Sequence, residues 1–97
     1  MNTTHYLIAR IDINDREGYS KYQAGFMEIF SQYDGKMLSV DEAPKLIEGE
    51  WPVSRTVLIE FPSKESAMVW YESEAYQALA QHRFASSDGN IVLLKGL

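Results

Sequence analysis

The sequence predicts an α+β domain, in which one antiparallel sheet carries two helices on one of its faces. Apolar and polar side chains alternate over residues 5–13 and 55–61, and this period of two is typical of strands. In the segment after each of these strands, apolar side chains recur every three to four residues, which is typical of helices. The chain has 97 residues, so we expect one domain spanning residues 1–97.

The N-terminal part of the chain predicts a strand followed by a helix. The strand His5–Ile13 has two different faces because its side chains alternate. Asn14 or Asp15 can cap the helix that we expect over Arg16–Tyr33, where six aromatic or aliphatic side chains share one face. Gly35 ends this helix because glycine tolerates the left-handed geometry of a helix stop.

The middle of the chain predicts a short hairpin and then a long strand. We expect strands at Lys36–Val40 and Lys45–Glu48, joined by a turn at residues 41–44. Glycine and proline place a loop at residues 49–52. Arg55–Phe61 alternates most clearly and is the best-defined strand.

The C-terminal part repeats the helix and strand pattern. Ser63 can cap a helix that is interrupted near Ser73, and this second serine can cap a further segment that ends at about Phe84. Residues 88–90 predict a turn, and Ile91–Lys95 predicts the last strand. The order β-α-β-β-β-α-β, in which the hairpin adds one short strand, is that of a ferredoxin-like sandwich.

Both faces of the predicted sheet carry apolar side chains. The set that can meet the helices consists of Leu7, Ile11, Val57, Ile59 and Phe61. Ile8, Leu58 and one face of Ile91–Leu94 would then contact water from the other side. Because an exposed apolar patch marks an interface, and a second copy packed sheet to sheet would cover it, we expect a homodimer.

Composition narrows the classes of partner. The chain has 9 Lys and Arg against 14 Asp and Glu, a net charge of −5, which argues against nucleic acid and anionic membranes as partners. There are no cysteines, no glycine-rich phosphate loop and no histidine spacing typical of a metal site, so we expect no metal and no cofactor. No secretion signal or membrane-spanning stretch is visible, and with the absent cysteines this predicts a cytoplasmic protein.

Several motifs together resemble one protein family. In chain order they are Tyr19-x-x-Tyr22, Asp34-Gly35-Lys36-Met37-Leu38, Leu46-Ile47-Glu48-Gly49-Glu50-Trp51, Arg55-Thr56-Val57-Leu58-Ile59-Glu60-Phe61-Pro62-Ser63, Ala67, Trp70-Tyr71-x-Ser73-x-x-Tyr76 and Arg83. This pattern is similar to the domain-of-unknown-function family DUF1330 over nearly the whole chain. The resemblance implies a dimeric α/β barrel, whose relatives by fold include cofactor-independent monooxygenases, muconolactone isomerases and small stress-induced proteins. It implies no settled function, and an activity would transfer by fold analogy alone.

The chain departs from the family pattern at three places. Asp34 stands where the family has a glycine, which is a mild change in a turn that ends a helix. Glu74 stands where the family has a proline, and both glutamate and proline suit the first turn of a helix. Lys95 stands where the family has an acidic residue before the last glycine. If that acidic residue belongs to a functional site in the family, this chain does not have it at that position.

The second helix carries the first candidate site, formed by Trp70, Tyr71, Ser73, Tyr76 and Arg83. As a pocket, these residues would bind a small anionic ligand: the arginine is a planar fork for a carboxylate or phosphate, the tyrosine hydroxyls orient the ligand, and the tryptophan is a flat wall. Alternatively, these residues have structural roles only. Trp70 and Tyr71 would then be core aromatics, Ser73 would be a helix cap, and Arg83 would pair with an acid such as Glu48 or Glu60. We favour the pocket for the arginine.

The first strand carries a second candidate. Arg10 lies on the face away from Leu7 and Ile11, flanked by Tyr6 and Asp12. Arg10 and Tyr6 could line a pocket of the dimer barrel. Alternatively, Arg10 pairs with Asp12 or with an acid of the second copy and fixes the register of the dimer, because a buried charge needs a partner.

Three further residues are candidates from their position. Trp51 could cover a pocket and Glu48 could act as a general base, since both stand in a loop. Alternatively, Trp51 packs on the second copy. His5 could shuttle protons at a pocket mouth, whereas His82 is expected at the surface.

Two classes of function follow from these features. In the first, a pocket between the sheet and the second helix binds a small anionic or polar organic molecule, and fold analogy adds monooxygenase- or isomerase-like catalysis without a cofactor. In the second, the protein is a non-catalytic, stress-related ligand-binding dimer or an accessory dimer. The sequence leaves open whether the protein is an enzyme.

Overall fold

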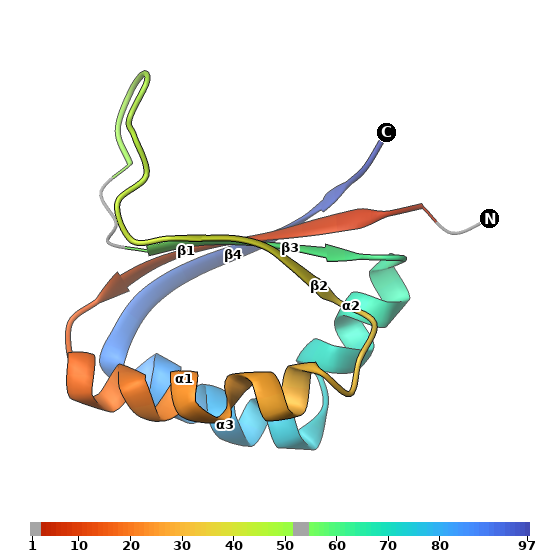
Figure 1. Cartoon of the computed structure of the whole chain (residues 1–97), viewed down its shortest axis with the longest axis horizontal. Coiled ribbons are helices and arrows are strands. Elements are labelled where there is room, and N and C mark those ends of the chain that lie inside the picture. Colours follow the sequence, from red (N-terminus) through yellow and green to blue (C-terminus); the bar gives the residue numbers. More distant parts are fainter. Residues whose placement is uncertain (1–2, 52–54) are drawn as a thin grey trace.

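One four-stranded antiparallel sheet carries all of the helices on one of its faces (Figure 1). The computed structural model describes residues 3–51 and 55–97. Its elements are β1 (His5–Ile13), α1 (Arg16–Phe30), β2 (Lys36–Asp41), β3 (Arg55–Phe61), α2 (Lys64–Tyr71), α3 (Glu74–Ser86) and β4 (Ser87–Lys95). The strand order β2-β3-β1-β4 places β1 and β3 at the centre. This is the ferredoxin-like α+β arrangement that the sequence predicts.

The helix caps confirm the predicted helix starts. The side chain of Asp15 accepts a hydrogen bond from the backbone N–H of Gly18 at 3.2 Å. Ser63 and Ser73 do the same for the starts of α2 and α3, at 3.1 and 3.2 Å. Each cap satisfies one of the free backbone donors at a helix start, which is why these short polar residues begin the three helices.

Helix α1 ends three residues before the predicted boundary at Tyr33. The backbone N–H groups of Gln32 and Tyr33 donate to the carbonyls of Ile29 and Phe30, three residues back. This tighter turn leaves the α-helical hydrogen-bond pattern, so the helix ends at Phe30.

The predicted strand at Lys45–Glu48 is wrong. Residues 42–51 instead leave the sheet as an arm on the side opposite to the helices (Figure 1). Where the arm leaves the sheet, Asp41 accepts a hydrogen bond from the backbone N–H of Ala43, and Glu42 forms ion pairs with Arg16 and Arg55. Pro52, part of the predicted loop at 49–52, lies outside the described residues.

The turn predicted at residues 88–90 is also wrong, because these residues belong to β4. All nine residues of β1 pair with β4, from His5 opposite Lys95 to Ile13 opposite Ser87. Gly89 lies opposite Ile11 in this ladder. The long neighbouring strand therefore overrides the local turn preference of Asp-Gly-Asn.

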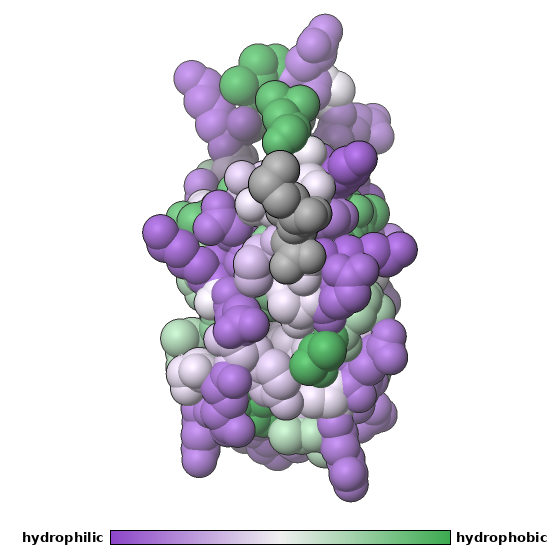
Figure 2. Space-filling model, turned by 90° about the vertical axis from the view of Figure 1, so that its right-hand side faces the viewer, coloured by the Kyte–Doolittle hydropathy of each residue, from purple (hydrophilic) through white to green (hydrophobic). Residues whose placement is uncertain are grey.

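The core lies between the sheet and the helices. The buried apolar side chains are Leu7, Ala9, Ile11, Tyr19, Tyr22, Phe30, Val57, Ile59, Phe61, Ala67, Trp70, Tyr76 and Ala80. All five residues predicted to meet the helices are among them. Figure 2 shows the end of the molecule at the right of Figure 1, where hydrophilic side chains dominate and apolar patches are small and separate. No helix within residues 3–51 and 55–97 is long and apolar enough to cross a membrane.

The outer face of the sheet, away from the helices, carries a second apolar row. Leu58, Ile8 and Val92 lie opposite one another across β3, β1 and β4. Val92 is 53% exposed and Leu94 is 47% exposed. The prediction that apolar side chains occupy both faces is confirmed.

Candidate functional site

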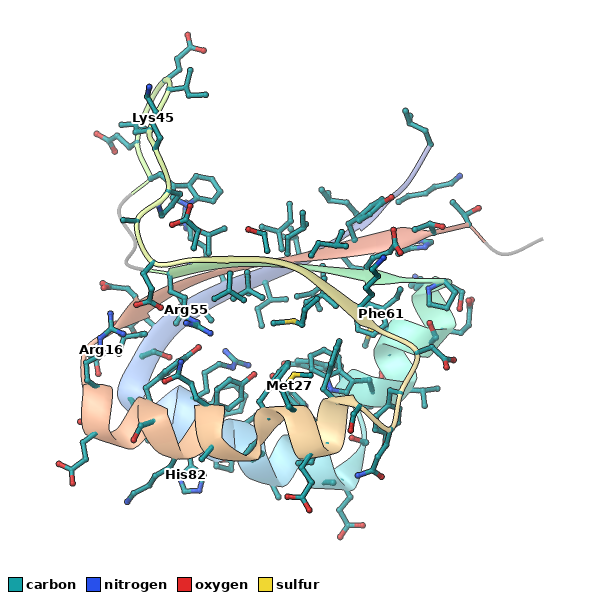
Figure 3. The ribbon with its side chains drawn as sticks, in the orientation of Figure 1. Arg16, Met27, Lys45, Arg55, Phe61 and His82 are labelled. Carbon is teal, nitrogen blue, oxygen red and sulfur yellow. The ribbon has the colours of Figure 1, made fainter. Side chains whose placement is uncertain are left out.

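A cavity of about 210 Å³ lies between the helix face of the sheet and helices α1 and α3. Its wall is mostly apolar, and Phe26, Met37, Ile59 and Trp70 are among the apolar lining residues. Figure 3 shows Met27, which also lines the cavity, pointing from α1 toward the sheet. Because a dry cavity of about 150 Å³ can hold benzene, this space accommodates a molecule slightly larger than one six-membered ring.

The polar part of the wall consists of Tyr19, Tyr22, Gln23, Arg55, Tyr76 and Arg83. None of the lining residues in the described part of the chain is Asp, Glu or His. The wall therefore combines two cations with neutral hydroxyl and amide groups, and no described lining side chain brings a negative charge of its own at neutral pH.

Arg83, in the last turn of α3, is only 4% exposed. Its guanidinium carbon lies 5.8 Å from the centre of the Tyr22 ring and 4.8 Å from that of Phe84. Burial lowers the pKa of Arg83, but the neighbouring hydroxyls of Tyr76 and Tyr22 raise it by more, so the guanidinium stays charged.

The backbone of β4 makes room for this guanidinium. A Cβ atom at Gly89 would lie 3.2 Å from Nη1 of Arg83, which is tighter than most Cβ contacts in proteins. With a side chain at position 89, Nη1 would have to move by a few tenths of an ångström. Since Gly89 lies opposite Ile11, the guanidinium of Arg83 sits at the same end of the sheet as Ile11.

No acid balances Arg83 within the described chain. The structural alternative placed Glu48 or Glu60 beside it, and this is wrong. The ion pairs among the described residues join Glu42 to Arg16 at 2.8 Å and to Arg55 at 2.6 Å. Because a buried charge without a partner is costly, Arg83 is the feature of this cavity that most needs an explanation.

Arg55 places a second cation at the same end of the cavity. It lies opposite Ile11 on β3, just as Gly89 lies opposite Ile11 on β4. Its guanidinium carbon is 5.7 Å from the centre of the Tyr19 ring, and Figure 3 shows Arg55 pointing from the sheet toward the helices. Unlike Arg83, Arg55 already has a carboxylate partner.

Two tyrosine hydroxyls are paired in the wall. The hydroxyls of Tyr22 on α1 and Tyr76 on α3 lie 2.7 Å apart and are buried. Burial, strengthened by Tyr76, raises the pKa of Tyr22 far above its ordinary value. Tyr22 therefore stays protonated over the physiological pH range, and it acts as a hydrogen-bonding group rather than as a base.

Buried nitrogen atoms without a hydrogen-bond partner concentrate around this cavity. Within the described residues there are five: Nε of Arg10, Nε of Arg55, Nε1 of Trp70, and Nε and Nη2 of Arg83. The last four belong to residues of the cavity wall. These atoms have almost no accessible surface, so they lie within the packing around the cavity and are not presented to its interior. Buried donors are normally paired, which makes this part of the core polar and unusual.

Of the candidates on the second helix, Trp70, Tyr76 and Arg83 line the cavity. Tyr71 lies beside it, with its ring 6.2 Å from that of Trp70 between centres. Ser73 caps α3, and its hydroxyl also donates to the carbonyl of Trp70 at 2.8 Å.

The candidates from β1 and the arm lie elsewhere. Arg10 and Tyr6 are on the outer face, where the guanidinium carbon of Arg10 lies 5.1 Å from the centre of the Trp51 ring. Trp51 also donates to the hydroxyl of Thr56 at 2.9 Å. Glu48 is exposed on the arm. His5 donates from Nδ1 to the carbonyl of Thr3 at 2.7 Å and is not part of the cavity wall, while His82 is exposed as expected.

The sequence reasoning missed Tyr19, Tyr22 and Arg55 as site residues. It assigned both tyrosines to the core face of α1 and treated Arg55 only as the start of a strand. Hydroxyls three residues apart on a buried helix face were the available signal, because buried hydroxyls need polar partners.

Solved structures share this fold over nearly the full chain at low sequence identity. RPA0582 from Rhodopseudomonas palustris, a protein of unknown function, aligns with a TM-score of 0.82 and 17% identity over 100% of this chain and 85% of its own. A dimeric ferredoxin-like protein of unknown function from Thermobifida fusca aligns with a TM-score of 0.72 and 11% identity, covering 99% and 93%. SnoaB from Streptomyces nogalater, a cofactor-independent oxygenase, aligns with a TM-score of 0.68 and 11% identity, covering 98% and 94%.

These structural similarities establish the fold and carry no activity over to this chain. No curated protein matches the sequence. The model of a domain of unknown function, DUF1330, matches residues 4–97. The match covers both the helices and the strands that build the cavity, and it agrees with the resemblance of the motifs. The chain therefore belongs to the DUF1330 family.

Proposed function

We propose that this protein is a homodimer in which each subunit binds a small organic molecule with an anionic or polar end. The ligand occupies the cavity between the sheet and helices α1 and α3. One observation carries this proposal: Arg83 is a buried cation in the wall of a mostly apolar cavity, and no described acid balances it. An anionic group of a ligand would supply the missing counter-charge.

The outer face of the sheet supports the homodimer. Its row of Leu58, Ile8 and Val92 is apolar and in part exposed within one subunit. A second copy packed sheet to sheet would bury this row on both subunits. The Thermobifida fusca relative, which is a dimeric ferredoxin-like protein, has a similar fold and supports the same assembly.

Catalysis without a cofactor is the second candidate. The hydroxyl pair of Tyr22 and Tyr76, next to the charge of Arg83, would stabilise an oxyanion that forms on a bound molecule. The fold similarity to SnoaB, a cofactor-independent oxygenase, supports this reading. The alternative is a ligand-binding or accessory dimer that carries out no reaction.

A thermal-shift screen tests the binding proposal. Small carboxylates, phenols and lactones are added to the full chain, to Arg83→Met and to Lys21→Met, which removes an equal charge from an exposed position of α1. We expect at least one compound to raise the melting temperature of the wild type and of Lys21→Met but not of Arg83→Met, because binding stabilises the native state.

The screen can also contradict the proposal. If no compound shifts the wild type and Arg83→Met melts far below Lys21→Met, then Arg83 has a structural role, and an accessory dimer without a small-molecule site becomes the better reading.

A further inference from the structure

Three hollows of the described chain meet at one side chain, that of Ile91. The first is the cavity of about 210 Å³ between the sheet and helices α1 and α3. The second is a polar hollow of about 550 Å³ at the start of β4, which Arg83 and Asp88 line. The third is a mostly apolar hollow of about 250 Å³ between α2 and β4. Among the lining residues only Ile91 belongs to all three walls, so its side chain lies between the cavity and both outer hollows.

The neighbours of Ile91 leave this part of the wall to its side chain alone. Ile91 is half-buried and lies directly opposite Ala9 of β1, on the helix face of the sheet. Because side chains alternate along a strand, the preceding residue of β4 on the same face is Gly89, which has no side chain. Ala9 and Gly89 fill little volume. Since a core relaxes only partially when a side chain is shortened, a smaller residue at position 91 would leave a gap between the hollows.

The cavity opens to solvent on the other side of the sheet. Gln23 and Met27 of α1 line the cavity and are exposed, Met27 by 56%. Met37 lines the cavity from β2, which is the edge strand opposite to β4 in the order β2-β3-β1-β4. The open side of the cavity is therefore the β2 side, and Ile91 stands at the inner end on the β4 side.

The volume of the cavity limits how much of a ligand it buries. A cavity of about 150 Å³ holds one benzene ring, so two rings in line need roughly 300 Å³. The cavity offers about 210 Å³. The second ring of a longer ligand would remain at the open β2 side, where it stays in contact with water and gains little from burial.

We propose that Ile91 is a specificity-determining residue, which ends the cavity on the β4 side and restricts the buried part of the ligand to about the size of one ring. This inference rests on the proposed function and adds a size limit to the same cavity. A smaller side chain at position 91 joins the cavity to the hollows beyond it. A second ring then lies against Tyr71, which lines both outer hollows.

Calorimetric titration of the full chain with phenol and para-phenylphenol tests the inference. Both compounds carry one hydroxyl, and para-phenylphenol has a second ring in line with the first. We expect the wild type to bind the two compounds within about threefold of each other, because the second ring gains little burial. We expect Ile91→Ala to bind para-phenylphenol about tenfold more tightly than the wild type does, and to bind phenol no more tightly.

Leu93→Ala is the matched control. Leu93 is the next residue of β4 on the helix face, and it lines the third hollow but not the cavity. We expect Leu93→Ala to bind both compounds as the wild type does. Ile91→Val shortens the side chain less and keeps the inference testable if Ile91→Ala does not fold; we expect it to bind para-phenylphenol about two- to fourfold more tightly than the wild type does. Circular dichroism shows which variants are folded.

The outcomes distinguish this inference from the proposed function. If para-phenylphenol binds the wild type much more tightly than phenol does, the cavity already takes two rings and the size limit is overturned. If Ile91→Ala and Leu93→Ala change the affinity for para-phenylphenol by the same factor, the role of Ile91 is overturned. In both cases a compound that raises the melting temperature in an Arg83-dependent way still supports the binding proposal. If no carboxylate, phenol or lactone binds the wild type, both proposals fall.

Discussion

The two faces of the sheet each hold an arginine, and the environments of these arginines differ. Arg83 on the helix side is buried, with the ring of the core residue Tyr22 and that of the half-exposed Phe84 beside its guanidinium. Arg10 on the outer side is covered by Trp51, which comes from a projecting arm and is 42% exposed. On the helix side, α1, α2 and α3 cover the sheet within one subunit. The outer side lacks a covering layer.

The apolar rows of the two faces show the same contrast. Leu7 and Ile59, opposite one another on the helix face, are buried. Ile8 and Leu58, the next pair of the same antiparallel ladder, lie on the outer face and are only half-buried. Since a shift of one residue changes the face, the same two strands present one apolar row to the core and a second apolar row to the outer face.

The largest expected effect is on assembly. Leu58→Glu places a carboxylate at the centre of the outer row, where a dimer would bury it without a partner. We expect the association to weaken by about 3 kcal/mol, roughly 100-fold, seen as a monomer by light scattering at micromolar concentration. The control Val69→Glu, at an exposed position of α2, is expected to leave the dimer intact. A wild type that is itself monomeric would contradict the outer-face argument directly.

The next effect concerns the hydroxyl pair on the helix side. Tyr22→Phe and Tyr76→Phe each remove one hydroxyl and leave the other buried without its partner. We expect each single change to lower the free energy of unfolding by about 1–2 kcal/mol, and the double change to cost clearly less than the sum. Urea unfolding of the four proteins measures this coupling. Strict additivity would mean that the 2.7 Å contact contributes no net interaction.

Local patterns in the sequence predicted most of the fold but only part of the site. Alternation and cap residues predicted β1 and the starts of all three helices, because these depend on neighbours in the chain. Trp70, Tyr76 and Arg83 were found because they share one short stretch. Tyr22, Arg55 and Gly89 come from elements far apart in the sequence.

What brings these distant residues together is strand register. Arg55, Ile11 and Gly89 lie side by side because β3 and β4 pair with β1 at that level. The sequence alone predicted a turn at residues 88–90, since Asp-Gly-Asn favours one locally. Only the pairing with β1 shows that Gly89 leaves the room that Arg83 occupies.

A smaller effect is expected where Glu42 links the end of β2 to α1 and β3. The hydrogen bond from Arg55, together with Arg16, holds the pKa of Glu42 below its ordinary range. Such a group stabilises the fold above the ordinary glutamate pKa of about 4.3, and the contribution is lost as pH falls through the lowered value. Glu42→Gln should therefore lower the free energy of unfolding by at most about 1 kcal/mol at pH 7, because both ion pairs of Glu42 are partly exposed. Urea unfolding of the wild type and Glu42→Gln at a series of pH values measures this. We expect the difference between their free energies of unfolding to shrink as the pH falls into the acid range. A difference that stays constant would mean that the charge of Glu42 does not contribute to stability.

The smallest effect tests whether the two faces are independent. Trp51→Ala removes the ring over Arg10 and the hydrogen bond to Thr56, both at the foot of the exposed arm. A cation–π contact at an exposed site contributes about 0.5–1 kcal/mol, so the free energy of unfolding of one subunit should fall by no more than about 1 kcal/mol. Ligand affinity at Arg83 should change less than twofold, because Arg10 and Thr56, which Trp51 contacts, do not line the cavity. Trp51→Phe keeps an aromatic ring and is the control. A large loss of ligand affinity in Trp51→Ala but not in Trp51→Phe would mean that the outer face helps to shape the cavity. The environments of Arg83 and Arg10 would then be coupled.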